Sequence, residues 1–329
     1  MAMSDDVARV SAVAGEVLDR VGTVLVGKRE PLELVLAGIL AGGHVLLQDL
    51  PGLGKTLTAR SLARALGLDF HRLQFTPDLL PADVTGSLLY DQRTTDFVFR
   101  PGPVFTQLLL ADEINRTPPK TQAALLEAMQ ERQVSVGGET HVLRSPFHVL
   151  ATANPIEYEG TYPLPEAQLD RFLLRVSFGY PDADEELQVL QRRMTRRSEE
   201  AEIEAVTDAA AVLAMQATLE SVVMDDSIGR YIVDLVAHTR ADSRVLVGAS
   251  PRGSLALMLL GRAKAVLAGR GFVIPEDVQA VAIPALAHRI TLRPEMWMRR
   301  VDPESIVADA LAAVPMPASG ATPSYGTGT

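Results

Sequence analysis

The first half of the chain alternates short, mainly apolar runs with longer segments of helical periodicity. The apolar runs cover residues 44–48, 107–111 and 148–153. Runs of this length are typical of strands that are buried on both faces of a parallel sheet. Before the first run, one apolar helix face is expected from the spacing of Leu32, Val35, Leu36, Ile39 and Leu40. The pattern predicts an α/β unit in which helices cover a parallel sheet, with a further strand at residues 70–75.

Two segments of this half are predicted to be insertions that the parallel sheet itself does not require. Residues 133–136 and 140–143 alternate around Gly137-Gly138, which predicts a hairpin. Residues 84–103 also alternate in part and end at Pro101-Gly102-Pro103, which favours an inserted hairpin or a short helix.

From residue 181 to Asp309 the pattern is helical throughout. Helices are expected to start at Ser250-Pro251 and at Pro275, and Asp182 with Glu185 has capping-box spacing. After Asp309 no charged residue follows, and the proline and glycine content predicts a disordered tail. The expected domains are an N-terminal helix at 1–20, an α/β core at 21–180, an all-helical domain at 181–310 and the tail at 311–329.

Composition narrows the class of protein. The chain has 329 residues and 47% hydrophobic residues, enough for two domains with their own cores. It contains no cysteine, the first residues do not resemble a signal peptide, and no apolar run spans a membrane, so a cytoplasmic location is expected. The six histidines lack metal-ligand spacing. The net charge of −10 argues against nucleic acid as a partner.

The segment that follows the first apolar run carries the strongest chemical signal. Glycines at 52 and 54 precede Lys55 and Thr56 at the start of a helical pattern, which is the arrangement of a phosphate-binding loop. The lysine would reach phosphate oxygens, and the hydroxyl would serve Mg²⁺. The full motif has glycine at position 49, whereas this chain has Asp49. That carboxylate is compatible with a bound triphosphate only if it points away.

The other two apolar runs end in residues that such a site requires. The run 107–111 leads into Asp112-Glu113, which suits one carboxylate for Mg²⁺ and one for the attacking water. The run 148–153 leads into Asn154. Taken singly, the acidic pair could be a helix start and Asn154 a turn residue. Taken together, strand ends of a parallel sheet converge on one site.

At this point the sequence resembles the MoxR-type AAA+ ATPases from about Val26 to about Leu292. The motifs that carry the resemblance are Val26-Gly27-Lys28, Asp49–Thr56, Gln74–Pro81, Ala111–Asn115, Ala153-Asn154-Pro155, Leu164–Phe172 and Ala249–Arg252. Asp49 matches a variation of the loop found in that family. The resemblance implies a P-loop AAA+ core with hairpin insertions that line a ring pore, followed by a helical lid domain.

The resemblance also implies an activity. It implies a chaperone-like ring, expected to be a hexamer, that hydrolyses ATP with Mg²⁺ to remodel or assemble client proteins, which often carry a von Willebrand A-type domain. The cofactor-binding residues would be Val26, Gly27, Pro51, Gly52, Leu53, Gly54, Lys55, Thr56, Leu57 and Asp112, with Thr56 and Asp112 serving the metal. The catalytic residues would be Glu113, Asn154, Arg171 and Arg252.

Two arginines and one glutamine receive roles from the resemblance. Arg252 follows a helix start, where a cation costs roughly a few tenths to 1 kcal/mol unless a phosphate is near, and it resembles the lid arginine called sensor 2. Arg171 resembles the finger that reaches a neighbouring subunit's nucleotide, with Arg175 one helical turn on as the second candidate. Gln74 either restrains Glu113 or is only a polar residue at a strand end.

Two other functions remain open from the sequence. The chain could be another AAA+ motor, such as a helicase or a magnesium-chelatase-type subunit, and stimulation of its ATPase by DNA would favour the helicase. It could also be a nucleotide-binding scaffold with little turnover, although such a scaffold has no need of Asp112, Glu113, Asn154 and Arg252 together.

Overall fold

The computed structural model describes residues 2–154, 161–196 and 203–317 and divides into two compact units. One unit is Val13–Gln216, and the other combines Met1–Ala12 with Ala217–Thr329. Helices α1 (Ala2–Gly22) and α8 (Ala209–Glu220) contribute to both. Pro155 of the Asn154 motif and residues 318–329 of the expected tail lie outside the described residues.

The unit Val13–Gln216 is built on a five-stranded sheet in which every pairing is parallel. The strand order is β2-β5-β8-β1-β9. The strands are β1 (Val45–Gln48), β2 (Phe70–Gln74), β5 (Leu108–Asp112), β8 (His148–Ala153) and β9 (Leu174–Val176). The parallel sheet predicted from the apolar runs is confirmed. The strand β9 was not anticipated, because three residues are too few to form a recognisable run.

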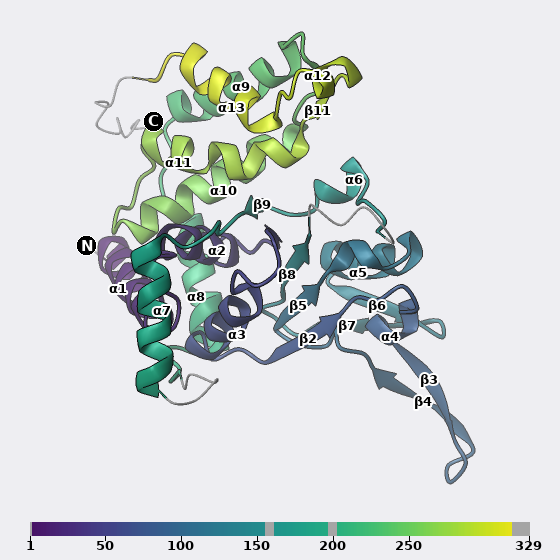
Figure 1. Ribbon diagram of the computed structural model, residues 1–329. Coiled ribbons are helices and arrows are strands. Elements are labelled where there is room, and N and C mark those ends of the chain that lie inside the picture. The colour runs from purple at the N-terminus through teal and green to yellow at the C-terminus, as the bar shows by residue number, and fades with distance from the viewer. Residues whose placement is uncertain (1, 155–160, 197–202, 318–329) are drawn as a thin grey trace, which may run out of the picture. The chain divides into compact units, whose positions relative to one another are not determined.

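Helices cover both faces of this sheet. In Figure 1, α2 (Arg29–Leu40) and α3 (Lys55–Ala65) lie on one side and α5 (Pro119–Glu131) on the other. The apolar face predicted for 32–40 is fully buried on α2. On the opposite side, Leu125 and Met129 of α5 pack with alternate residues of β5 and β8 in one core. The unit also contains η1 (Ile114–Arg116), α6 (Glu166–Leu169) and α7 (Ala183–Arg196).

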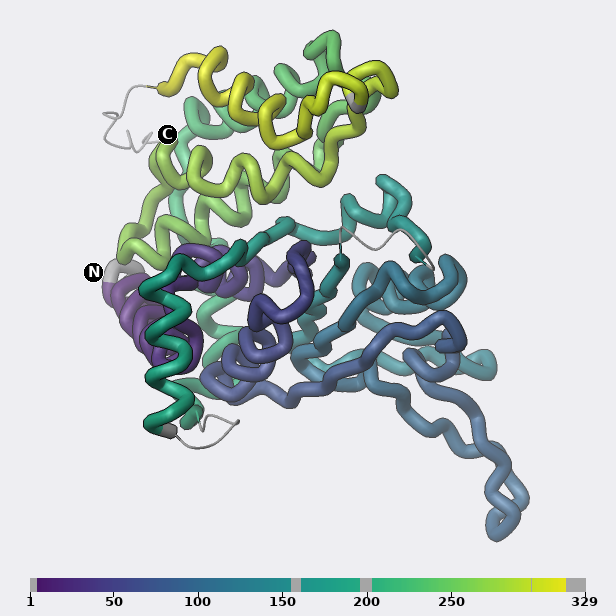
Figure 2. Tube along the Cα trace, in the orientation of Figure 1, coloured from purple at the N-terminus to yellow at the C-terminus, as the bar shows by residue number. Residues whose placement is uncertain are grey.

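Two hairpins extend the unit, as the alternating segments predicted. One is β6 (Gln133–Val136) with β7 (Glu139–Val142). The segment 84–103 holds part of a short helix as well as a hairpin, namely α4 (Pro81–Thr85), β3 (Gly86–Asp91) and β4 (Asp96–Pro101). The second hairpin projects from the rest of the unit in Figure 2. The hairpins touch, because Phe99 stacks on His141 with ring centroids 3.8 Å apart.

The other unit is mainly helical. Its elements are α9 (Asp226–Ala241), α10 (Pro251–Leu267), α11 (Pro275–Leu286), η2 (Ala287–Arg289), α12 (Pro294–Met298) and α13 (Pro303–Ala313). The helix starts predicted at Pro251 and Pro275 are confirmed. The expectation of a helical pattern throughout was wrong in one place, since β10 (Val245–Val247) and β11 (Thr291–Leu292) form an antiparallel ribbon.

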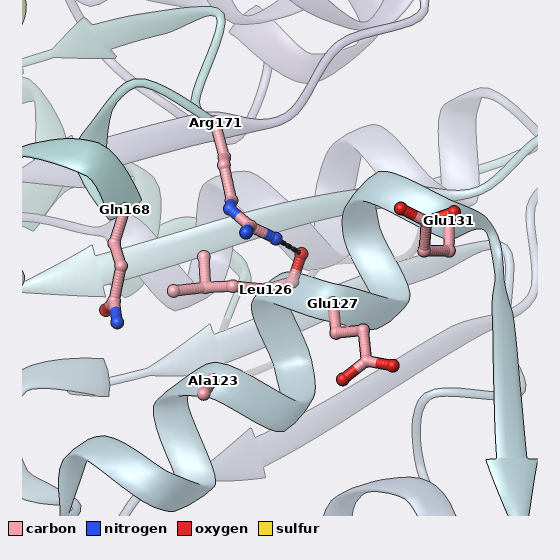
Figure 3. A pocket seen from close by; sticks show the side chains of 6 residues that line it. All are labelled: Ala123, Leu126, Glu127, Glu131, Gln168 and Arg171. Atoms are coloured by element: carbon pink, nitrogen blue, oxygen red, sulfur yellow. Dashed lines mark hydrogen bonds between the residues drawn. The ribbon is translucent and has the colours of Figure 1, made fainter.

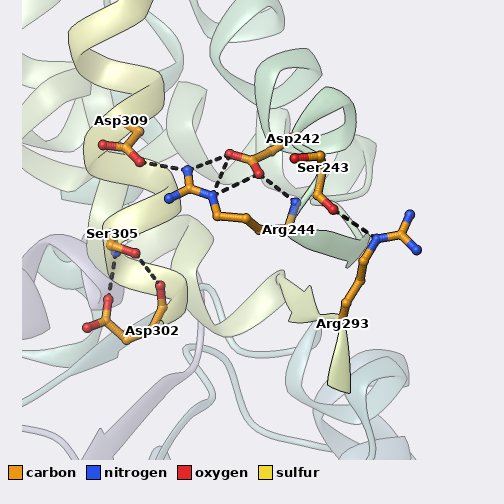
Figure 4. A network of polar contacts seen from close by, with 7 residues as sticks. All are labelled: Asp242, Ser243, Arg244, Arg293, Asp302, Ser305 and Asp309. Carbon is orange, nitrogen blue, oxygen red and sulfur yellow. Dashed lines mark hydrogen bonds and ion pairs between the residues drawn. The ribbon is translucent and has the colours of Figure 1, made fainter. Parts of the chain in front are cut away.

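Charged groups hold that ribbon against α13. Arg244 donates to Asp242 and to Asp309, each at 2.6 Å, and Arg293 donates to the carbonyl of Ser243 at 2.9 Å (Figure 4). The Arg244 guanidinium lowers the pKa of the Asp242 carboxyl below its ordinary value. The loop before β10 is thereby fixed to the last described helix.

The helix α7 follows residue 181, where the sequence predicted the start of the helical domain. The predicted capping box is present: the Glu185 carboxylate accepts from Asp182 N at 3.0 Å, and the Asp182 carboxylate accepts from Glu185 N at 2.8 Å. In the structure α7 belongs to the α/β unit, and Arg192 donates to the carbonyls of Gly22 and Thr23. The domain limits stay a prediction. None of the helices in the described ranges combines the length and the apolar character needed to cross a bilayer.

Candidate functional site

The carboxyl ends of four strands lie at one edge of the sheet. Gln48, the last residue of β1, pairs with Ala153 of β8. Ala111 of β5 pairs with Ala151 of β8, and Asp112 pairs with Gln74 at the end of β2. The segments that follow these strands therefore start side by side, as the sequence predicted for the phosphate-binding loop, the acidic pair and Asn154.

The loop between β1 and α3 has the backbone of an anion-binding turn. Gly52 and Gly54 have φ values of +84° and +82°, a conformation that side chains disfavour. The helix α3 starts at Lys55, so the first amides of the helix have no partners within it and point toward the loop. Thr56 is half-buried and Leu57 is 36% exposed at this helix start.

Lys55 contacts the loop and is influenced by the charges of the acidic pair. Its amino group donates to the carbonyls of Asp49 and Leu50, at 2.5 and 3.1 Å. Burial lowers the pKa of Lys55 from its ordinary value, while the charges of Asp49, Asp112 and Glu113 raise it. The lysine is therefore within electrostatic range of all three carboxylates.

Asp49 points away from the loop, as a bound triphosphate requires. Its carboxylate accepts from Ser177 Oγ at 2.7 Å, from Phe178 N at 2.5 Å and from Gly179 N at 3.3 Å. Asp49 as a whole residue is 6% exposed. In place of the motif glycine, this chain therefore has a carboxylate that binds the segment after β9.

That segment also reaches the residues proposed from the Val26-Gly27-Lys28 motif. Lys28 donates to the carbonyl of Tyr180 at 3.0 Å and pairs with Glu185 at 3.5 Å. Gly27 has φ +68°, and a Cβ built there would clash with the Glu185 carboxylate at 1.7 Å. Val26 is 7% exposed. The motif and the loop are therefore joined to the same stretch, residues 177–185.

Asp112 has both of its carboxylate oxygens engaged. One accepts from the Thr152 hydroxyl at 2.6 Å, and the other accepts from Arg72 Nε and Nη2 at 3.0 and 2.7 Å. The side chain is 10% exposed. Neither partner was singled out in the sequence, because both lie within strands and contact Asp112 only across the sheet.

Glu113 is held in an unusual backbone conformation. Its φ of +57° and ψ of +49° are left-handed, which is rare outside glycine and is found preferentially at functional sites. Its N–H donates to the Thr152 hydroxyl at 2.7 Å. One carboxylate oxygen accepts from Gln74 Nε2 at 2.6 Å and pairs with Arg116 Nε at 3.1 Å. Of the two readings of Gln74, the contact favours a restraint on Glu113.

Asn154 follows β8 at the same edge and is 7% exposed. Its carbonyl accepts from Asn115 Nδ2 at 3.3 Å, which links it to the turn after the acidic pair. The three predicted strand-end positions are therefore neighbours within one unit.

The two candidate finger arginines occupy different places. Arg171 follows α6 and donates to the carbonyl of Leu126 on α5 at 2.6 Å, beside a pocket that Glu127 and Glu131 also line (Figure 3). Arg175 lies in the strand β9 and donates to Gln48 Oε1 at 3.2 Å. The expectation that one helical turn separates them was wrong, because the chain leaves α6 at Leu169 and becomes a strand.

Arg252 stands in the mainly helical unit, at the second position of α10. Ser250 caps that helix by accepting from Arg252 N at 3.2 Å, as the sequence predicted. Its approach to a phosphate stays a prediction.

The donors and acceptors at the sheet edge fit a nucleotide phosphate with Mg²⁺. The loop has amides and an ammonium group, and Thr56 and Asp112 each have side-chain oxygen atoms of the kind that Mg²⁺ binds. Within the described ranges no cluster of three or more acidic or histidine side chains could hold a metal ion by itself. Mg²⁺ typically takes one or two protein ligands and completes its shell with phosphate and water.

Comparisons with known proteins agree with this geometry. Residues 44–174 match the family model for the ATPase family associated with various cellular activities, and residues 237–310 match the AAA lid domain. The chain is 50% identical to the uncharacterised protein YeaC of Bacillus subtilis, over 92% of this chain and 94% of that protein. It is 41% identical to the chaperone MoxR1 of Mycobacterium tuberculosis, over 92% and 82%. A crystal structure of a Cytophaga hutchinsonii protein matches with a TM-score of 0.88 and 40% identity, covering 95% of this chain and 98% of the other.

Proposed function

Because the chain belongs to the MoxR-type AAA+ ATPases, we propose that it hydrolyses ATP with Mg²⁺ and uses the cycle to remodel or assemble partner proteins. The observation that carries the proposal is the shared sheet edge. There Lys55 lies within electrostatic range of Asp112 and Glu113, and Glu113 and Asn154 follow neighbouring strands.

In this proposal the residues around the loop bind the triphosphate. The amides of residues 52–57 and the Lys55 ammonium group hold its β- and γ-phosphate oxygens. Val26 and Gly27 lie at the adenine base of the nucleotide. Thr56 and Asp112 would hold Mg²⁺, and the ion would supply positive charge that offsets the charge of the phosphates. Asp49 keeps its own charge out of the loop by binding residues 177–179.

Hydrolysis then depends on Glu113 and Asn154. Glu113 takes a proton from water as the water oxygen bonds to the γ-phosphorus and the bond to ADP breaks. Asn154 orients that water. Gln74 restrains Glu113 through the hydrogen bond at 2.6 Å until a partner binds.

The proposal places hydrolysis between subunits of a ring, which we take to be a hexamer. Arg171 acts on the neighbouring subunit's nucleotide, and Arg252 acts on that of its own subunit and couples turnover to movement of the lid. The clients are proteins, some with a von Willebrand A-type domain. The relative named as a chaperone supports this class of role. A cytoplasmic location remains part of the proposal.

Replacement of Glu113 tests the proposal. The variant Glu113→Gln keeps size and hydrogen bonding but cannot take up the proton, so turnover should fall by about 10² to 10⁴-fold while the dissociation constant for ATP stays within about threefold. Phosphate release and calorimetric titration with ATP measure the two quantities. The variant Glu276→Gln makes the same chemical change at an exposed position of α11 and should keep parental turnover.

The outcomes separate the alternatives. Parental turnover by the Glu113→Gln variant would exclude Glu113 as the base. A parental protein that binds ATP without turnover, alone and with clients, would be a scaffold. A functional ATPase whose Glu113→Gln form retains client proteins would identify those clients by pull-down.

A further inference from the structure

Arg72 on β2 contacts Asp112 of the acidic pair and also Gln74, the residue that binds Glu113. Its Nε and Nη2 bind the same Asp112 oxygen, at 3.0 and 2.7 Å. The same Nη2 donates to Gln74 Oε1 at 2.9 Å. The two strands are in register here, because Arg72 pairs with Leu110 and Gln74 pairs with Asp112.

The contact with Gln74 determines how that amide is turned. An amide presents an acceptor on one side and donors on the other, and rotation by 180° exchanges them. Arg72 carries only donors, so the Gln74 oxygen must face it. The NH₂ group then faces Glu113, where it donates at 2.6 Å. With the amide reversed, two oxygens would face each other and the restraint on Glu113 would be lost.

The contact with Asp112 fixes the arginine itself. Asp112 is 10% exposed, and the Thr152 hydroxyl binds its other oxygen at 2.6 Å, so the carboxylate has a defined orientation. Two nitrogens of a planar guanidinium on one oxygen orient the plane of Arg72. Orientation therefore passes from Asp112 through Arg72 to Gln74, and from Gln74 to Glu113.

We propose that Arg72 is a positioning residue for the catalytic glutamate: it binds Asp112 and Gln74 together and thereby keeps the Gln74 amide turned to restrain Glu113. The inference rests on the proposed role of Glu113 as the base. Arg72 acts only through Gln74, and no step of the hydrolysis passes through its guanidinium.

A double-mutant cycle tests this inference on the full-length protein. Arg72→Met and Gln74→Met remove the polar groups and keep the apolar stems. Each should raise basal turnover of ATP by about tenfold to 150-fold, the range expected for loss of a hydrogen bond to a charged group. The KM for ATP should stay constant, because neither side chain is proposed to contact the nucleotide. The double variant should show no further increase, since both changes act on one contact.

Two further variants complete the design. Arg72→Lys keeps the charge but not the planar fork, so it should behave like Arg72→Met. Arg93→Met, at a residue whose side chain is 91% exposed, should keep parental turnover. Thermal unfolding checks that each variant is folded, and Arg72→Lys carries the test if Arg72→Met is not.

The inference is overturned if Arg72→Met leaves turnover unchanged or lowers it, if the two effects multiply in the double variant, or if Arg72→Lys matches the parental protein. The Glu113→Gln variant distinguishes this result from a failure of the proposed function. If the proposed function is wrong, Glu113→Gln retains turnover. If only the inference about Arg72 is wrong, Glu113→Gln still loses turnover.

Discussion

Asp49 illustrates what a single residue reveals only in the fold. In the sequence it is a departure from the glycine of the motif, and its partners Ser177, Phe178 and Gly179 lie about 130 positions away. The local sequence pattern indicates only that the carboxylate must point away from a bound triphosphate. It could not supply the partners, because the contact joins the end of β1 to the segment after β9.

We therefore predict that restoring the motif glycine at position 49 lowers the stability of the folded protein. Asp49→Gly removes three hydrogen bonds to the carboxylate of a residue that is 6% exposed, and the expected loss is about 2 to 4 kcal/mol in the free energy of unfolding. The affinity for ATP should not increase. Denaturant unfolding and calorimetry measure the two effects, and Asp49→Asn, which keeps an acceptor, should lose less. Unchanged stability of Asp49→Gly would show that the contacts contribute little.

Two buried histidines at the opposite ends of the strands predict a dependence of stability on pH. His44 accepts from Val149 N through Nδ1 and contacts the carbonyl of Met129 through Nε2, which fixes a neutral ring. His148 contacts the carbonyl of Gly43 through Nδ1 and Gln216 through Nε2. Burial lowers the pKa of His44 to about 3 and that of His148 to about 4.

The sign follows from proton uptake. Below pH 6.5 both rings become protonated in the unfolded chain, while they stay neutral in the folded protein. The contribution of the two histidines to the free energy of unfolding is therefore fully present above pH 6.5 and declines as the pH falls toward 4. The expected loss is about 1 to 2 kcal/mol per histidine between pH 6.5 and 5. His148→Gln should flatten the profile of unfolding free energy against pH, and His71→Gln, at an exposed residue, should not. Equal slopes for all three proteins would exclude this account.

At the scale of elements, the sequence predicted most of the sheet edge because each part is local. The apolar runs before Asp49, Asp112 and Asn154 are recognisable singly, and parallel strands bring their ends together. The sequence could not predict β9 or the β10–β11 ribbon, because strands of two or three residues depend on pairing with strands that are distant in the chain. The roles of Arg72 and Thr152 were hidden for the same reason.

The neighbouring residues Arg192 and Arg193 of α7 give a prediction for one element. Arg192 donates to the carbonyls of Gly22 and Thr23, both at 2.8 Å, at the end of α1. Cations that bind the last carbonyls of a helix stabilise it. Arg192→Ala should lower the free energy of unfolding by about 1 to 2 kcal/mol. Arg193→Ala changes the next, exposed residue of the same helix and should stay within about 0.5 kcal/mol of the parental protein.

At the scale of the whole molecule, the separate places of Arg171 and Arg175 favour one of them for action between subunits. Arg175 contacts Gln48, the residue before Asp49, and so lies beside the loop of its own chain. Arg171 instead donates to the carbonyl of Leu126 on α5 and lines a pocket of the surface (Figure 3). A guanidinium held by one carbonyl can be transferred to a phosphate, a stronger acceptor for it.

Mixed assemblies test action between subunits. Arg171→Ala and Lys55→Ala should each reduce turnover by at least about 10³-fold alone, the first through loss of the finger and the second through loss of nucleotide binding. Mixed in equal amounts, the two proteins should regain a measurable part of the parental turnover, because some interfaces then pair an intact loop with an intact Arg171. Arg175→Ala mixed with Lys55→Ala serves as the control: if Arg175 acts only within its own chain, those two defects give no such recovery. Absence of recovery with Arg171→Ala, under conditions where fluorescence energy transfer shows that subunits exchange, would place Arg171 in its own subunit's site or outside catalysis altogether.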